Sequence, residues 1–569
     1  MKEFVVKLVK AQTGLSRVQI DSMIEVPPKD SMGDFSFACF RLPKLFEEAG
    51  HPVPSNKNPL VIAEDLCKTF RKKLPKEISN VESLGGYVNF FVDKEILLKR
   101  VLKNSFSKDW GSLKLDNRKV GIEYPGPNTN KALHIGHLRN ISIGESISKI
   151  NKAVGNKVYH LNIYNDRGIL ICKSMIAYEK YASGKTPASE NVKGDKFVGD
   201  LYARFSKESE KNKDLEILAQ EKLKLWEAGD KKTLALWKKM NSWTYKGMQE
   251  TFDVFGLSKI DKNYYESEMY KHGKEIVATG LKKGLFKKKE GAVVIDLEKE
   301  KLGEKVLLRA DGTSLYVTQD LYLAEKRVKD FKLDSSYYVV GNDQDYHFKV
   351  LFSILDKLGL KKDLRHLSYG MVALPTGKMK SREGTAVSAD ELISNTQELA
   401  RKGLTGRGTE LSKKELEERS LKISLAAIKY TLLKVDIRKK IIFNPKEALS
   451  FEGDTGPYLL YSYARANSIL KKVNGRPKVK IMDMKDSEIR LLKKIDSFEG
   501  VVERAYRNLS PNLIANYSFE LAQMFNEFYH ACPVLGSVEE GFRLKLTEAF
   551  SRTLKRSLEL LGIETLEEM

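Results

Sequence analysis

Two histidines separated by an isoleucine and a glycine follow a turn rich in proline and glycine. They are His134 and His137, with Gly136 between them. The stretch 120–124 alternates as a short strand does, and the stretch 138–147 has apolar residues at helical spacing. A strand, a turn and a helix in this order place backbone N–H groups where they can hold a phosphate. Imidazoles there can donate hydrogen bonds to phosphate oxygens, and a glycine leaves room for close approach. This pattern predicts a phosphate site, although a surface histidine pair beside a turn would explain the spacing alone.

A second stretch with chemical potential is the basic run KMKSR at 378–382, about 240 residues further on. Together the two stretches resemble the HIGH and KMSKS signatures of class I aminoacyl-tRNA synthetases, enzymes that join an amino acid to ATP. The resemblance implies that His134, Gly136, His137, Lys378 and Met379 bind ATP. It also implies that the two histidines and Lys378 are catalytic, because adenylate formation relies on positioning and on cationic charge around the phosphates.

The second signature departs from the family pattern at Ser381, where a second lysine is expected. Lys380 and Arg382 flank that position, but neither need point the same way. We predict that Lys131, on the turn three residues before His134, supplies the missing positive charge and is catalytic. The alternative is that Lys131 is a solvated turn lysine.

Composition and charge restrict the class of protein. The 569 residues are too many for one core, and 41% hydrophobic with 31% charged residues is typical of a soluble globular protein. No apolar run is long enough for a transmembrane helix, and the start lacks a signal-peptide core, so we expect a cytoplasmic protein without a membrane partner. The net charge of +22 indicates a polyanionic partner such as RNA, unless it reflects a generally basic proteome. Four scattered cysteines argue against structural zinc.

The organisation of the chain predicts an α/β protein in three parts. Residues 1–110 are predicted to form a small α+β domain, and the polar stretch 104–116 is a linker. Residues 117–395 are predicted to form a Rossmann-like parallel-sheet catalytic domain, interrupted by a charged helical insertion at about 176–290 with three tryptophans as core anchors. Residues 400–569 read as an all-helical bundle. Because ligands of open α/β sheets bind at the carboxyl ends of the strands, Asn128, Asp166 and Gln344 are predicted to face one crevice.

Longer strings narrow the resemblance to the arginyl-tRNA synthetase family. The strings include EYPGPN at 123–128, LNIYNDRG at 161–168, VVGNDQDYHF at 339–348 and FEGDTGPYLLYSYAR at 451–465. The family implies an arginine–tRNA ligase whose partners are tRNA(Arg), L-arginine and ATP with Mg²⁺, without zinc, and which is a monomer. The residues implied to bind arginine are Glu123, Asn128, Glu266, Tyr316, Asp320 and Gln344.

The same resemblance assigns RNA contacts to the terminal domains. The N-terminal domain resembles an add-on domain that binds the outer corner of tRNA, with Phe35, Tyr87 and Asn89 as candidate contacts. The C-terminal bundle resembles an anticodon-binding domain, with Tyr458, Tyr461 and Arg465 as candidates, since aromatic and arginine side chains stack on bases. At helical spacing these side chains fit a helical core equally well.

Two other functions fit part of the sequence. One is a synthetase-derived RNA-binding factor without catalysis, against which the complete HIGH signature and Lys378 argue. The other is a class I synthetase for another basic or acidic amino acid. Pyrophosphate exchange with different amino acids and tRNA distinguishes all three.

Overall fold

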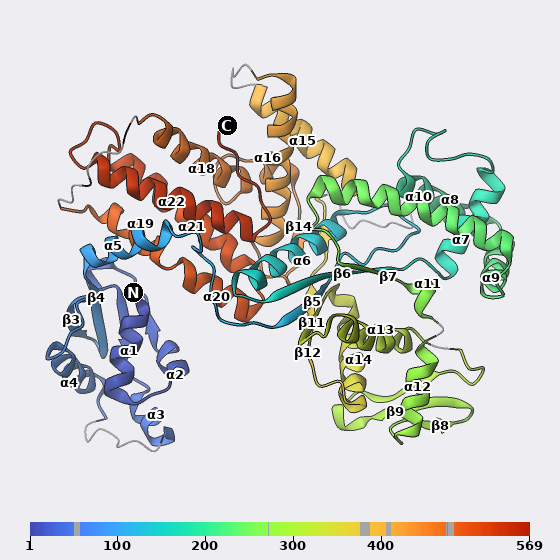
Figure 1. The fold of residues 1–569 in the computed structure, drawn as a ribbon, viewed down its shortest axis with the longest axis horizontal. Helices are drawn as coiled ribbons and strands as arrows, with labels where there is room; N and C mark the ends of the chain where they lie inside the picture. The colour runs from blue at the N-terminus through green and yellow to red at the C-terminus, as the bar shows by residue number, and fades with distance from the viewer. Residues whose placement is uncertain are drawn as a thin grey trace. The chain divides into compact units, whose positions relative to one another are not determined.

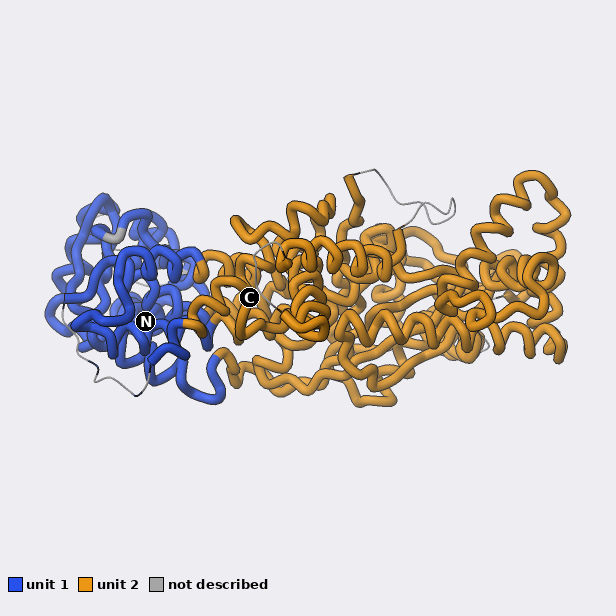
Figure 2. Tube along the Cα trace, turned by 90° about the horizontal axis from the view of Figure 1, so that it is seen from above, with its two compact units in different colours: residues 1–110, 469–499, 523–553 blue, residues 111–468, 500–522, 554–569 orange. Residues whose placement is uncertain are grey.

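The computed structural model describes residues 1–49, 57–270, 272–313, 315–375, 387–405, 411–473, 475, 479 and 483–569. Lys378 and Met379 of the second signature lie outside these residues. The chain forms two compact units, coloured separately in Figure 2. Unit 1 comprises residues 1–110, 469–499 and 523–553, and unit 2 comprises residues 111–468, 500–522 and 554–569.

Unit 1 contains an antiparallel sheet of four described strands in the order β1-β2-β4-β3. Gly85 and Gly86 make the turn between β3 and β4 with φ of +58° and +83°, as the Gly-Gly pair predicts. The strands are β1 (Ile24–Glu25), β2 (Phe35–Ala38), β3 (Ile78–Leu84) and β4 (Tyr87–Val92). The helices around them are α1 (Lys2–Thr13), α2 (Arg17–Asp21), α3 (Leu42–Ala49), α4 (Pro59–Arg71) and α5 (Lys94–Ser105).

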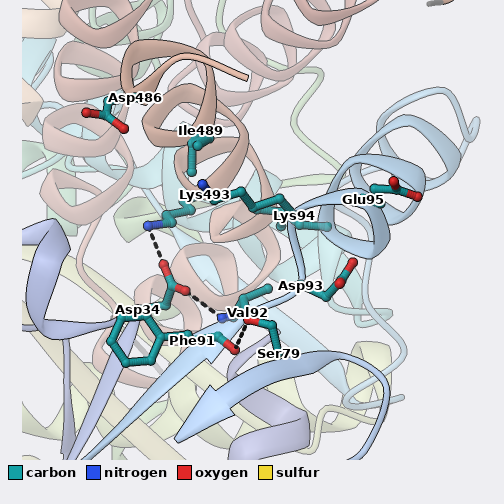
Figure 3. Close-up of a pocket in the computed structure, with 11 residues that line it drawn as sticks. Asp34, Ser79, Phe91, Val92, Asp93, Lys94, Glu95, Asp486, Ile489 and Lys493 are labelled. Carbon is teal, nitrogen blue, oxygen red and sulfur yellow. Dashed lines mark hydrogen bonds and ion pairs between the residues drawn. The ribbon is translucent and has the colours of Figure 1, made fainter. Parts of the chain in front are cut away.

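Part of the C-terminal helical region also belongs to unit 1. Helix α19 (Asp486–Asp496) packs against α5. Its Lys493 forms an ion pair with Asp34, which also accepts the N–H of Val92 at 2.6 Å (Figure 3). These residues line a cavity of about 450 Å³. Because Lys493 and Asp34 neutralise each other, this ion pair holds α19 at the wall of the cavity.

Unit 2 is built on a parallel sheet of five described strands in the order β12-β11-β5-β6-β7. This confirms the predicted α/β class. The order reverses between β5 and β11, and in such sheets the crevice at the reversal point is where ligands bind. The strands are β5 (Lys119–Glu123), β6 (Lys157–Tyr164), β7 (Lys262–Tyr265), β11 (Ser335–Gly341) and β12 (Asp363–Tyr369).

Helices cover both faces of this sheet (Figure 1). Helix α6 (Ile135–Ala153) packs against β5, β6 and β11. Its apolar residues form one core with those of α10 (Lys231–Phe255), α15 (Ala389–Thr405) and α16 (Lys413–Leu433). Helices α13 (Tyr316–Phe331) and α14 (Asp345–Leu358) form a second core with Tyr338 of β11. The site at the reversal point is therefore framed by the starts of α6, α13 and α14.

The helical segment after β6 packs as a small cluster of its own. Trp237 and Trp243 are partly buried at its edge, and the buried Trp226 lies beside Trp237, with 5.5 Å between the ring centroids. The helices are α7 (Ile169–Tyr181), α8 (Gly194–Lys211), α9 (Asp214–Glu227) and α10 (Lys231–Phe255). The predicted helical insertion at about 176–290 is not helical throughout, because residues 262–265 within it form β7, which pairs with β6, and residues 287–289 form a further strand. A four-residue strand in a long charged stretch leaves no alternation to detect.

The remaining elements complete the two units. The antiparallel strands β8 (Lys287–Lys289), β9 (Ala292–Leu297) and β10 (Gly303–Leu308) form a small sheet, and β13 (Val372–Ala373) pairs with β14 (Ile441–Ile442). The other helices are α11 (Glu266–Met269), α12 (Gly273–Lys282), α15 (Ala389–Thr405), α16 (Lys413–Leu433), α17 (Pro445–Ala448), α18 (Gly456–Lys471), α20 (Phe498–Asn508), α21 (Asn512–Ala531) and α22 (Glu540–Leu560), and the 3-10 helices are η1 (Asp30–Met32), η2 (Glu298–Glu300) and η3 (Asn342–Gln344). None of the described helices has the length and apolar character needed to cross a membrane.

The contact between α6 and β5 depends on Gly144. A Cβ atom there would lie 2.3 Å from the ring of the buried Tyr124. We predict that Gly144→Ala lowers the free energy of unfolding by about 1–3 kcal/mol through overpacking, measured by urea denaturation with circular dichroism. The control is Gly403→Ala on α15, where the nearest atom is 3.9 Å away. It should be neutral or slightly stabilising, and equal losses in both variants would contradict the packing argument.

Candidate active site

The two signature histidines cap the N-terminus of α6 with their own side chains. The N–H of Gly136 donates to Nδ1 of His134 at 3.1 Å, and the N–H of His134 donates to Nδ1 of His137 at 3.1 Å. Their rings lie 4.1 Å apart. Because each Nδ1 accepts a hydrogen bond, each ring in its neutral form carries its proton on Nε2. The pair can thus offer two Nε2–H donors beside the helix start.

The environment keeps both rings neutral. Burial, reinforced by the charge of Lys131, lowers the pKa of His134 to about 4. Burial together with His134 and Lys131 lowers the pKa of His137 well below its usual value. Protonation would also place a hydrogen on each Nδ1, opposite a backbone N–H donor. The capping geometry and the pKa shifts therefore favour the same neutral tautomer.

Gly136 is required by the fold of this turn itself. A Cβ atom at Gly136 would lie 2.9 Å from Cε1 and 3.0 Å from Nδ1 of His134. The His134 ring could then not approach the Gly136 N–H closely enough to cap it. The sequence predicts that Gly136 leaves room for a close neighbour, and in the structure the ring of His134 is one such neighbour.

The turn before the helix is also held from outside. Gly199 of α8 packs against it, and a Cβ there would lie 3.0 Å from the N atom of Ala132 and 3.2 Å from Cα of Lys131. Lys131 is half-buried, and its charge acts on both histidines. Lys131 therefore puts a positive charge at the helix start, where the sequence predicts a cation for the phosphates.

Carboxylates gather around the carboxyl ends of the strands on the other side of the site. Glu123, the last residue of β5, is buried and forms an ion pair with Arg327 of α13, which is 1% exposed. Burial raises the pKa of Glu123, and Arg327 opposes that rise. Asp320 lies near enough to act on both members of this pair. Glu123 is therefore already neutralised by a residue of the protein.

Two further carboxylates have less compensation. Asp320 on α13 bonds His347 of α14, with 2.7 Å between Oδ2 and Nε2. Glu266, at the start of α11, is 9% exposed, and burial raises its pKa to about 7. The charge of Arg167 opposes this rise, whereas the charges of Asp166 and Asp320 add to it. No ion pair joins Glu266 to another described residue, and Arg167 is paired with Glu227 at 2.7 Å. A buried carboxylate in this state favours a cationic ligand.

The other predicted pocket residues lie on the expected elements without contacting these carboxylates directly. Tyr316 begins α13, one turn before Asp320, and is 75% exposed. Asn128 pairs with Asn165 in a parallel bridge that extends the ends of β5 and β6. The exposed Gln344 ends η3, and its amide donates to Asp343 at 3.1 Å. Tyr316 and Gln344 are thus exposed, and Asn128 is half-buried.

Asp166 has a different place from the predicted one. Its carboxylate is buried and accepts hydrogen bonds from Tyr245 at 3.0 Å and from the N–H and the hydroxyl of Ser267 at 2.8 and 2.7 Å. It therefore ties α10 and α11 to the end of β6 instead of opening into the crevice.

Comparison with protein-family models decides the family. Residues 98–444 match the model described as tRNA synthetases class I (R), catalytic domain. Residues 2–92 match the arginyl tRNA synthetase N terminal domain, and residues 459–569 match the DALR anticodon binding domain. The chain belongs to the arginyl-tRNA synthetase family.

Individual relatives agree along the whole length of this synthetase chain. It is 44% identical to the arginine–tRNA ligase of Treponema denticola, over 96% of this chain and 94% of that protein. It is 39% identical to that of Borreliella burgdorferi, over 96% of this chain and 95% of that protein. Among solved structures, Thermus thermophilus arginyl-tRNA synthetase matches with a TM-score of 0.85 and 26% identity, over 100% of this chain and 99% of that one.

The residues predicted to contact tRNA differ in their surroundings. Asn89 is 4% exposed and accepts a hydrogen bond from the hydroxyl of Ser36, opposite it in the sheet. This side chain belongs to the sheet's interior, which corrects its assignment to the surface. Phe35 and Tyr87 are half-buried. On α18, the half-buried Tyr458 lies against Phe519, whereas the guanidinium of Arg465 lies 4.7 Å over the ring of Tyr461 and donates to its hydroxyl at 2.8 Å.

Sequence reasoning missed three titratable residues of this synthetase site. They are Arg327, which pairs with Glu123, His347, which bonds Asp320, and the buried Arg139 on α6. The spacing offered one usable signal, because Arg327 is seven residues after Asp320 and lies on the same face of a predicted helix. The other two had none.

Class I synthetases use ATP, and the described residues contain no group of three or more His, Cys, Asp or Glu side chains placed to hold a metal ion.

The pKa of His134 tests whether its ring is buried in the cap of α6. We predict that its imidazole titrates near pH 4 and stays neutral at pH 5, followed by NMR of protein labelled in histidine. Lys131→Met should move the midpoint upward, because it removes a repelling charge. A midpoint near 6.5, unchanged in the variant, would show that the ring is solvated and does not cap α6.

Proposed function

We propose that this chain activates L-arginine with ATP, forming arginyl-adenylate and pyrophosphate, and then transfers arginine to the 2′-hydroxyl of the terminal adenosine of tRNA(Arg). Membership of the family supports the reaction. The observation that supports arginine as the amino acid is the buried Glu266 beside Asp320, an excess of negative charge at the carboxyl ends of the strands. A guanidinium is permanently charged and carries five donors, which suits several carboxylate and amide acceptors.

In the proposed pocket, Asp320, Glu266 and Tyr316 receive the guanidinium. Asn128, Gln344 and Glu123 receive the backbone end of the amino acid, as the family pattern implies. Because Glu123 is paired with Arg327, it contributes an oriented acceptor more than a free negative charge. Lysine would leave some of these buried acceptors without a partner, which is costly, and this supports discrimination against it.

In the proposed activation step, the carboxylate of arginine attacks the α-phosphorus of ATP, and the bond from that phosphorus to pyrophosphate breaks. The N-terminus of α6 and the Nε2–H groups of His134 and His137 would donate to the phosphate oxygens. Neutral imidazoles suit this role because they can donate without taking a proton from solvent. Lys378 and Met379 of the second signature lie outside the described residues and keep their proposed ATP contacts by family pattern alone.

We also propose that three parts of the chain divide the work: residues 1–110 and 400–569 bind tRNA, and residues 117–395 carry the chemistry. The net charge of +22 supports a polyanionic partner. The pair formed by Tyr461 and Arg465 could stack on a base, as aromatic and guanidinium planes do. The family pattern supports a cytoplasmic monomer that takes ATP with Mg²⁺.

The direct test is charging of total tRNA with each of the twenty amino acids. Arginine alone should be attached, in an ATP-dependent reaction. Attachment of another amino acid would replace the proposed specificity. Tight tRNA binding without any charging would favour the RNA-binding factor.

The raised pKa of Glu266 predicts that arginine binding depends on pH. A guanidinium requires the ionised carboxylate, so binding below pH 7 must displace a proton. The dissociation constant for arginine, measured by titration calorimetry, should be about tenfold larger at pH 6 than at pH 8.

Glu266→Gln is the control for this pH dependence, because Asp166, Asp320, His347 and Arg167 all remain in it. This variant should bind arginine more weakly and with little change between pH 6 and pH 8. A wild-type affinity that does not vary with pH would remove Glu266 from the pocket.

The proposed role of Lys131 predicts a defect in the chemical step. Lys131→Ala should slow adenylate formation roughly 10²-fold or more, as for loss of one preorganised charge-stabilising group. Arginine affinity should hardly change, because the contact strengthens only in the transition state. The exposed Lys180 of α7 provides a matched control, and Lys180→Ala should be silent. Normal activation by Lys131→Ala, with a collapse in Lys380→Ala, would assign the charge to the second signature.

A further inference from the structure

Arg139 of α6 is a fully buried guanidinium two residues after His137. It is 0% exposed, and burial lowers its pKa to about 10. Its hydrogen bonds go to neutral carbonyls: Nη1 donates to Gly370 O at 2.5 Å and Nη2 donates to Ile437 O at 3.0 Å. Asp436, which acts on it electrostatically, bonds Arg438. An apolar side chain of similar length would avoid the cost of burying this charge. The buried guanidinium of Arg139 therefore needs an explanation other than stability.

The two carbonyls belong to segments that meet around the strand pair β13–β14. The N–H of Gly370 donates to Ile437 O at 2.9 Å, so this oxygen accepts from both Gly370 and Arg139. The pairing continues from Ile441 N to Met371 O at 3.1 Å. A Cβ at Gly370 would lie 2.5 Å from the carbonyl oxygen of Lys439, so the two backbones are in close contact.

These contacts bear on the second signature through the chain that flanks it. On the N-terminal side, Gly370 and β13 lead toward residues 376–386, and Arg139 holds this side. On the C-terminal side, the N–H of Ala389 donates to Leu133 O at 2.8 Å, and Ser388 bridges His134. Both flanks are therefore attached to the first turns of the helix that carries the signature histidines.

We propose that Arg139 is a positioning residue for the activation step. It fixes the β13–β14 pair against α6, so that the flanks of residues 376–386 keep a defined place relative to His134 and His137. The role rests on the proposed function, since the reaction that needs this alignment is adenylate formation. A forked guanidinium is suited to it because it holds two carbonyls from two segments at once, which an ammonium cannot do in the same geometry.

The test compares Arg139→Met, which removes both donors, with Arg139→Lys, which keeps a single charged donor group. Arginine-dependent pyrophosphate exchange with tRNA present is the readout. Arg139→Met should lower kcat at least tenfold while KM for arginine stays within twofold, and Arg139→Lys should recover part of the loss. The matched control is Ser146→Ala on the same helix, which removes a buried hydrogen bond to Leu560 O at 2.9 Å. It should lower the melting temperature without lowering kcat.

A kcat within twofold of wild type in Arg139→Met would overturn the inference. So would equal losses of kcat in Arg139→Met and Ser146→Ala variants of similar melting temperature. If Arg139→Met does not fold, a wild-type kcat in Arg139→Lys overturns the proposal, and a tenfold loss at unchanged KM supports it.

Hydrogen exchange separates failure of this inference from failure of the proposed function. If the wild type shows no arginine-dependent exchange of pyrophosphate, the proposed function fails and kcat cannot be compared. The amide exchange of peptides covering 370–373 and 437–443 should still be at least tenfold faster in the folded Arg139 variant, with the exchange of β5 and β6 unchanged. Equal exchange of these peptides in wild type and variant would overturn the positioning role.

Discussion

The hydrogen bonds that two imidazoles accept at the start of α6 are the constraint on which the active site depends. Each Nδ1 accepts a backbone N–H, at 3.1 Å in both cases, so each ring is fixed in place and in tautomer. Gly136 has no side chain because the ring of His134 occupies that space, and Gly144 has none because Tyr124 does. The helix start, the turn before it and the end of β5 are therefore positioned as one group. Nε2–H donors and a helix N-terminus both favour an anion there.

Charge is arranged in opposite senses on the two sides of the reversal point of the sheet. At the start of α6, two neutral imidazoles and Lys131 provide donors and positive potential. Around α11 and α13, Asp320 and Glu266 leave a negative excess that Arg167 and Arg327 do not cancel, because each is already paired with another carboxylate. An enzyme that joins a cationic amino acid to a polyphosphate needs both potentials side by side. The fold supplies them by bringing different strand ends to one edge.

The sequence predicted the parts of this site that follow local rules. The strand, turn and helix around the HIGH signature were readable because the periodicity changes from two to about four residues within that stretch. The stretch YYVVGND at 337–343 was readable as a buried parallel strand with a polar end, and β11 (Ser335–Gly341) overlaps it. In contrast, β7 was missed because four residues among charged helices show no pattern. The assignment of Asn89 to a tRNA contact was wrong for a physical reason. Alternation shows that a strand has two faces, but it does not show that Ser36 of the neighbouring strand covers Asn89.

The partners of the site residues could not be predicted from the sequence. Arg327 and His347 pair with Glu123 and Asp320 through contacts between elements, and the seven-residue spacing of Arg327 from Asp320 was the one local signal for either pair. Arg139 is adjacent to the HIGH signature, yet its carbonyl acceptors lie 231 and 298 residues away in the chain. Such long-range pairs decide the charge of each carboxylate and the alignment of the signatures, so the pocket's electrostatics emerge only from the folded chain.

We infer that unbalanced carboxylates select a cationic amino acid at this site. The most direct measurement is kcat/KM for L-arginine and for L-citrulline, which has nearly the same shape but an uncharged ureido group, in pyrophosphate exchange with tRNA present. Citrulline should be used about 10²-fold less efficiently or worse, as for loss of one partner of a buried charged pair. Comparable efficiency with the two amino acids would show that shape, and not the charge of Asp320 and Glu266, determines specificity.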